Sequence, residues 1–216
     1  MEVTLFIVTA FIETIAIFML IFSIFMFPLR GYVPHILFTS LIMAQASLLI
    51  HEVYNLKAFA PIVMLVLIIV ILWLTFRVQL FYAALMAVTG YLAYILFQTV
   101  LVLIFQLMFS YDEIIAETNI TRMLQLCTSL LMIVVARILY LKRIGFSFVP
   151  DSERERIKLM GLNIVFLVIL LVASIALAIL YLYAMSGLPQ LITTAVVLAV
   201  ILAFFFYLAI RKERDQ

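Results

Sequence analysis

The most unusual chemical group in this sequence is a carboxylate inside an apolar stretch. Glu13 stands in FIETIAIF, well within a hydrophobic run that begins near the N-terminus. An ionised carboxylate deep in a membrane is costly unless it is paired or protonated. Glu13 is therefore either a functional group or a hydrogen-bonding structural group, and the sequence leaves both interpretations open.

Amide side chains interrupt the later apolar stretches in the same way. The residues that share this property are Gln45, Gln98, Gln125 and Asn163. Amides hydrogen-bond between helices in membranes and contribute about 1 kcal/mol each, so helix packing is their ordinary role. With Glu13 they form the candidate intramembrane polar site.

Motifs for catalysis or metal binding are incomplete. His51 and Glu52 match the first half of HExxH, in which two histidines one helical turn apart bind zinc, but Asn55 replaces the second histidine. The other histidine, His35, is expected at the opposite face of the membrane. Cys127 lies in QLCTSLL without a nearby base that could activate it. We therefore predict no catalytic residues, no metal, no cofactor and no enzymatic activity.

Composition places the chain in a membrane. Of its 216 residues, 69% are hydrophobic and 11% are charged, whereas soluble domains are about half apolar and a quarter charged. The net charge of +2 is not concentrated as a nucleic-acid interface requires, so nucleic acid is excluded as a partner. Most of the surface must face the lipid bilayer.

Breaks between the apolar runs define the spans. A helix needs about 20 apolar residues to cross the hydrocarbon core, and charges, proline or glycine separate the runs. The sequence thus predicts an all-α, polytopic transmembrane helical bundle that forms a single domain over residues 1–216. Its seven expected spans are residues 3–28, 35–56, 60–76, 80–109, 121–141, 159–185 and 190–210.

The distribution of basic residues predicts the orientation. Cytoplasmic loops are enriched in lysine and arginine. With the N-terminus outside and the C-terminus in the cytoplasm, 11 of the 13 basic residues fall inside, and only Lys57 and Arg122 remain outside. An even number of spans would separate the basic loop 142–158 from the basic tail, so this asymmetry favours an odd number.

A resemblance to a known family rests on three segments: the early FIETIAIF, the span ending in VVARILYLKR before a charged loop, and the last span running into FFFYLAIRKERDQ. This layout resembles the membrane sensor module of the accessory-gene-regulator-type histidine kinases, the peptide pheromone receptors of Gram-positive bacteria. The resemblance implies an extracellular peptide ligand and a signalling last helix. The sequence up to Gln216 departs from that family in having no phosphoacceptor histidine region and no ATP-binding domain, so we expect either a free-standing relative of such a sensor or a membrane domain separated from its effector. The implied partner is a cytoplasmic kinase or another membrane protein.

Two functional hypotheses follow from this layout. The first is a sensor or regulatory protein of the bacterial plasma membrane that receives an extracellular or intramembrane ligand or partner and signals to a cytoplasmic component. The alternative is a small transporter or channel component that uses the midspan polar residues. Ser174 and Ala178 form a small-xxx-small step, which would allow a homodimer through close helix approach.

Overall fold

The computed structural model describes residues 2–28, 31–54, 59–110, 113–114, 118–149, 162–184 and 187–214, and the regular elements within them are all helical. The long helices are α1 (Glu2–Ile24), α2 (Val33–Leu48), α3 (Ala60–Leu74), α4 (Leu80–Phe105), α6 (Thr118–Lys142), α7 (Leu162–Ala184) and α8 (Leu188–Arg214). A π-helical turn, η1 (Leu49–Val53), extends α2. The predicted all-helical class is confirmed over this part of the chain.

Five of these helices are long and apolar enough to cross a membrane. They cover Val3–Ile24, Val33–His51, Leu80–Phe105, Thr118–Lys142 and Leu188–Arg214. Two further apolar helical stretches among the described residues, Ala60–Leu74 in α3 and Asn163–Leu177 in α7, fall short of that length. The chain is therefore a helical membrane protein. Five of the seven expected spans are matched by helices long enough to cross, and the third (60–76) and sixth (159–185) are matched by the shorter stretches.

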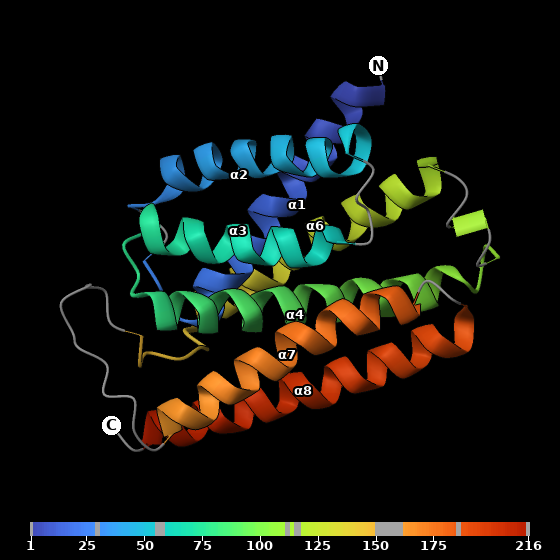
Figure 1. Cartoon of the computed structure of the whole chain (residues 1–216). Helices are drawn as coiled ribbons and strands as arrows, with labels where there is room; N and C mark the ends of the chain where they lie inside the picture. Colours follow the sequence, from blue (N-terminus) through green and yellow to red (C-terminus); the bar gives the residue numbers. More distant parts are fainter. Residues whose placement is uncertain are drawn as a thin grey trace.

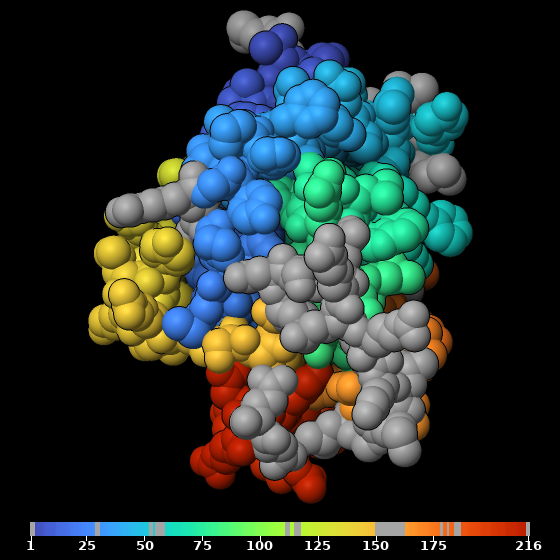
Figure 2. All heavy atoms as spheres, turned by 90° about the vertical axis from the view of Figure 1, so that its left-hand side faces the viewer, coloured from blue at the N-terminus to red at the C-terminus, as the bar shows by residue number. Residues whose placement is uncertain are grey.

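Successive helices alternate in direction, as Figure 1 shows, so the ends of α1, α3, α6 and α8 lie together with the starts of α2, α4 and α7. Figure 2 looks onto this face of the bundle, where residues 143–149 (amber) lie between the blue end of α1 and the red end of α8. We call this face the basic end. Among the described residues, the basic ones at the helix ends and in the turns here are Arg77, Lys142, Arg143, Arg211, Lys212 and Arg214.

Three helices stop at the basic end in a turn that contains a residue with a positive φ angle. Met26, Arg77 and Arg143 follow α1, α3 and α6 and have φ angles of 49°, 54° and 52°. After α1 and α6, the N–H of the next residue donates to a carbonyl five residues earlier, Phe27 to Phe22 at 2.8 Å and Ile144 to Leu139 at 3.0 Å, which is the Schellman arrangement. After α3, the N–H of Val78 donates to the Leu72 carbonyl, six residues earlier, at 3.1 Å. Each turn satisfies a carbonyl of the last helical turn. The turn after α1 explains why this helix ends at Ile24 although the apolar run continues to 28.

Helix α4 is the centre of the bundle. It packs against α1, α3, α6, α7 and α8, and most of its N-terminal half is buried. Gly90 allows the closest approach: a Cβ atom there would lie 2.2 Å from Cγ1 of Ile21 on α1. The lack of a side chain at this position therefore sets the distance between α1 and α4.

Candidate functional site

A hydrogen bond between Glu13 and Gln125 joins two helices in the middle of the bundle. The Nε2 group of Gln125 on α6 donates to the Glu13 carboxylate on α1. Both side chains are partly buried, and α1 and α6 pack against each other directly. Two residues of the predicted polar site, 112 positions apart in sequence, are thus brought together.

Helix α4 adds a tyrosine to this pair. Tyr94 is 1% exposed, and its hydroxyl lies 3.1 Å from Oγ of Ser129 on α6. Tyr94 also hydrogen-bonds the Glu13 carboxylate. Ser129 in turn donates to the backbone carbonyl of Gln125 at 2.7 Å. We call Glu13, Tyr94, Gln125 and Ser129 the midspan cluster; it connects α1, α4 and α6 through polar groups.

Two other predicted site residues lie apart from this cluster. Gln45 is exposed on α2, and Gln98 is partly buried on α4, one turn after Tyr94. Within the described residues, neither amide hydrogen-bonds Glu13. Of the predicted polar residues, Gln125 therefore lies at the Glu13 carboxylate, whereas Gln45 faces outward.

Asn163 belongs to a second site, at the basic end. Its Oδ1 atom accepts a hydrogen bond from Nζ of Lys212 at 2.9 Å, which joins the start of α7 to the end of α8. Lys212 is only 7% exposed. Its ammonium group also lies 3.4 Å from the hydroxyl of Tyr82 on α4. The predicted amide is thus a partner of a buried lysine.

Aromatic rings surround the Lys212 ammonium group. Its Nζ atom lies 4.7, 4.9, 5.5 and 5.6 Å from the ring centres of Tyr82, Phe148, Phe166 and Phe81, respectively. Aromatic faces attract cations at these distances. We call Lys212, Asn163 and these four rings the lysine cage. It brings side chains of α4, α7 and the segment after α6 together around the positive charge of Lys212 on α8.

The segment 143–149, which follows α6, is attached to two other helices. The N–H of Phe146 donates to the carbonyl of Ile24 at the end of α1, at 2.7 Å. Ser147 donates its N–H to both carboxylate oxygens of Glu213 on α8, each at 3.0 Å, and its hydroxyl to one of them. Gly145 allows the connecting backbone to approach α1 this closely, because a Cβ atom there would lie 2.7 Å from the Ile24 carbonyl oxygen. We call residues 143–149 the connecting segment.

Sequence reasoning missed Tyr94, Ser129 and Lys212. For Lys212 a signal exists: it continues the buried stripe of α8, formed by Leu198, Leu202, Phe205 and Ala209, at the spacing of three and four residues that marks one helix face. The expected last span ends at residue 210, so Lys212 lay beyond it, whereas α8 continues to Arg214.

Residues with metal-binding or nucleophilic side chains lie apart. His51 contacts its own helix, where its Nδ1 atom is 2.9 Å from the carbonyl oxygen of Ser47. His35 stands at the start of the same helix beside Tyr32 and Phe76. Cys127 is a partly buried free thiol on α6. In the described part of the chain, no group of three potential metal ligands assembles.

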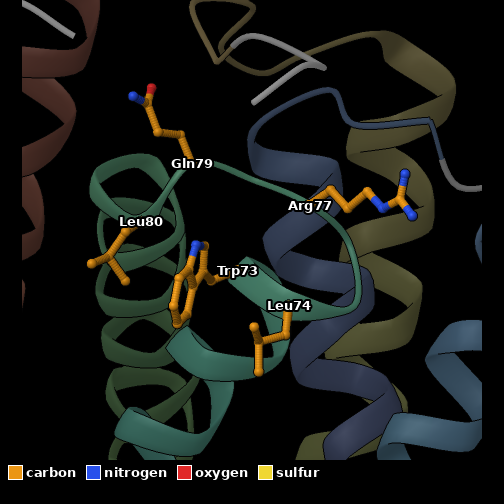
Figure 3. Close-up of a pocket in the computed structure, with 5 residues that line it drawn as sticks. All are labelled: Trp73, Leu74, Arg77, Gln79 and Leu80. Atoms are coloured by element: carbon orange, nitrogen blue, oxygen red, sulfur yellow. The ribbon is translucent and has the colours of Figure 1, made fainter. Parts of the chain in front are cut away.

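A surface cavity of about 470 Å³ lies at the turn between α3 and α4, lined by Trp73, Leu74, Arg77, Gln79 and Leu80. Figure 3 shows the Trp73 ring between Leu74 and Leu80, whereas Arg77 and Gln79 point away from the ring and from each other. Binding sites need polar groups that converge on a ligand. This cavity does not have them.

No protein family, no curated protein and no solved structure matches the chain. The fold and the two sites define an all-helical membrane protein with polar contacts between its helices. Its function is therefore argued from the midspan cluster, the connecting segment and the lysine cage.

Proposed function

We propose that this chain is a sensor or regulatory protein of the bacterial plasma membrane. It spans the bilayer seven times with the N-terminus outside, receives an extracellular or intramembrane ligand or partner, and signals to a cytoplasmic component. The observation that carries the proposal is the attachment of the connecting segment to the end of α1 through Phe146 and to the end of α8 through Ser147.

A mechanical route follows from these contacts. Glu13 on α1 is bonded to α6, and the end of α1, about 16 Å further along the helix at 1.5 Å per residue, holds the connecting segment. That segment holds Glu213 and lines the cage around Lys212. A ligand that shifts α1 against α6 would therefore move the end of α8. Helices and packed side chains transmit such shifts because they have few alternative arrangements.

Two features support the topology in this proposal. Most described basic residues of the helix ends lie on one face of the bundle, with Arg122 near the start of α6 at the other, and we assign the more basic face to the cytoplasm because positive residues favour that side. The first residues of the short helix α3, Ala60 and Pro61, are buried against the rest of the bundle. A helix of 15 residues crosses the bilayer where the bilayer is locally thinned or where neighbouring helices shield the helix ends.

The test combines partner capture with topology. A photo-crosslinking residue at Arg211 or Arg214, both exposed on α8, should capture a cytoplasmic protein in intact cells. The same residue at Val200, exposed on the apolar part of α8, is the control and should not. Cysteine labels at 113 should react from outside the cell. Labelling of 113 from the cytoplasmic side only, or equal capture from all three sites, would contradict the proposal.

The alternative is a transporter or channel component, and the midspan cluster favours it specifically. Ionisable residues inside membrane bundles often mark proton or ion pathways, and Glu13, bonded to Gln125, is such a residue. Purified protein in vesicles decides between the two functions. Solute or proton flux that Glu13→Gln abolishes would support transport, whereas vesicles without flux, together with partner capture in cells, would support the sensor.

The peptide ligand and the signalling partner come from the resemblance, and the homodimer comes from the small-xxx-small step on α7. We infer an extracellular peptide ligand and a cytoplasmic kinase or other membrane protein as the signalling pair, with a homodimer formed through α7. Ser174 on α7 is partly buried, and its hydroxyl donates to the Leu170 carbonyl of the same helix at 2.8 Å. Because the hydroxyl is satisfied within α7, a second helix can pack against this small side chain.

A further inference from the structure

An apolar groove lies between α1, α2 and α6, toward the basic end. Its volume is about 240 Å³. The residues that line it are Ile15, Met19, Val33, Ile36, Leu37, Arg137 and Tyr140. Val33 is the first residue of α2, and Arg137 and Tyr140 belong to the last two turns of α6. The groove thus begins where the bundle meets the headgroup region and extends toward the membrane interior.

Arg137 gives the mouth of this groove a positive charge. The side chain is exposed, and none of the described carboxylates forms an ion pair with it. A guanidinium group binds phosphate through two parallel hydrogen bonds. Tyr140, one helical turn away, also lines the groove and carries a hydroxyl group.

The start of α2 adds a second positive feature at the same mouth. The residue before α2, Tyr32, makes no side-chain cap hydrogen bond, and Pro34 follows in the first turn. The N–H groups at such a helix start carry a partial positive charge that favours anions. Val33, which lines the groove, is at this position. Two elements, the end of α6 and the start of α2, therefore contribute positive charge to the lining of one groove.

We propose that this groove binds an anionic glycerophospholipid. The phosphate lies between Arg137 and the start of α2, and the upper part of one acyl chain lies along Ile15, Met19 and Leu37. The volume is below the roughly 300–1,000 Å³ of small-molecule sites, which suits one chain held from the side. Basic pockets between membrane helices on the cytoplasmic side bind anionic headgroups for the same reason.

The site has a consequence for the proposed sensor, although lipid binding can occur without signalling. The groove is shared by α1 and α6, the two helices that the Glu13–Gln125 bond joins. A bound lipid would hold these helices at their cytoplasmic ends. Anionic lipid would thereby oppose a displacement of α1 from α6. Only this consequence, and not the lipid site itself, rests on the proposed function.

The test measures lipid retention on the full chain. The purified protein in detergent is mixed with phosphatidylglycerol or phosphatidylcholine, and bound lipid is counted by native mass spectrometry. The parent should retain phosphatidylglycerol preferentially, and Arg137→Gln should reduce that retention about five-fold, as expected for loss of about 1 kcal/mol from one basic contact. Arg211→Gln removes the same charge from an exposed position of α8 outside the groove and should retain the lipid.

A second variant tests the acyl-chain part of the site. Leu37 is 46% exposed, so Leu37→Trp should fill the groove without disturbing the core and should displace the lipid while Arg137 is intact. Free inorganic phosphate should not compete, because it lacks the chain. Equal retention of both lipids, an equal loss in Arg137→Gln and Arg211→Gln, full retention in Leu37→Trp, or displacement by inorganic phosphate would overturn the proposal. None of these readouts depends on signalling or transport.

Discussion

Ser147 and Glu213, 66 residues apart in sequence, hold the connecting segment on the last helix: both the N–H and the hydroxyl of Ser147 donate to the Glu213 carboxylate. Lys212, which precedes Glu213 on α8, points into the lysine cage. Two successive side chains of α8 with opposite charge thus contact the same segment, Glu213 at Ser147 and Lys212 at Phe148. This double attachment fixes where α8 leaves the bundle.

Removing either partner of this attachment should loosen the connecting segment without unfolding the bundle. Hydrogen bonds to charged groups contribute about 1.5–3 kcal/mol when shielded and less when exposed as here. We expect Glu213→Gln and Ser147→Ala to increase cleavage of residues 143–149 by an added protease, each several-fold, with little change in the thermal midpoint in detergent.

The double variant provides the control for this interpretation. If Ser147 and Glu213 act on each other, Ser147→Ala combined with Glu213→Gln should be cleaved about as fast as the more sensitive single variant, since coupled residues are not additive. Cleavage rates that multiply would show that the two residues act separately.

The lysine cage should accept only a positively charged side chain at position 212. Lys212→Met keeps the length and removes the charge, so it should lose the cation–π and amide contacts, about 1–2 kcal/mol. Lys212→Glu places an anion against the negative faces of Tyr82 and Phe148 and should destabilise the protein much further. Thermal unfolding in detergent measures both effects.

Arg211 is the matched control for this substitution. It precedes Lys212 on α8 but is exposed, so Arg211→Glu reverses a charge at the same bundle end without entering the cage. It should leave the midpoint nearly unchanged. Equal losses for Arg211→Glu and Lys212→Glu would mean that net charge, rather than the cage, determines the stability.

Gly145 should not accept a side chain. A Cβ atom would lie 2.7 Å from the Ile24 carbonyl oxygen and 2.8 Å from that of Ser23, and these are backbone atoms that cannot move alone. Gly145→Ala should therefore separate the connecting segment from α1 and lower the thermal midpoint. Gly31→Ala is the control, since no atom lies within 4 Å of a Cβ there; a similar loss in both variants would contradict the close contact.

The loop between α4 and α6 gives a pH-dependent prediction. Glu113 accepts the N–H of Ser110 at 2.8 Å, and its own N–H donates to the Ser110 hydroxyl at 3.3 Å, the reciprocal arrangement of a capping box. The backbone hydrogen bond, followed by the hydroxyl contact, lowers the pKa of Glu113. A lowered folded-state pKa stabilises the turn above the ordinary carboxyl pKa, and this contribution is lost as the pH falls through the folded value.

Ser110→Ala should bring the Glu113 pKa back toward its ordinary value, because the hydroxyl contact is removed. The titration of the Glu113 carboxyl carbon, followed by NMR in detergent, measures this. An unchanged titration in Ser110→Ala would show that the serine side chain does not contribute.

The helical class of this protein could be predicted from the sequence because lipid requires long apolar runs with internal backbone hydrogen bonds. Glu13 and Gln125 were both identified as polar residues in such runs, but their pairing was not, since it depends on how α1 and α6 rotate against each other. Gln45 shows the limit: its polarity is the same, yet it faces outward. Lys212 was not part of the predicted site, because the expected last span ends at residue 210, whereas the buried face of α8 continues to Lys212.

The last prediction concerns the Glu13–Gln125 bond. Glu13→Gln keeps a donor and an acceptor at this position and should preserve folding, whereas Glu13→Leu leaves the Gln125 amide without its partner and should cost about 1–3 kcal/mol. Adding Gln125→Leu to Glu13→Leu should recover part of that loss, because replacing both partners by apolar groups removes the unsatisfied amide. Gln45→Leu, at an exposed amide, is the control and should change little. Thermal unfolding in detergent compares the four variants. If Glu13→Leu is as stable as the parent, the carboxylate does not hold α1 to α6, and the route from the midspan cluster to the connecting segment fails with it.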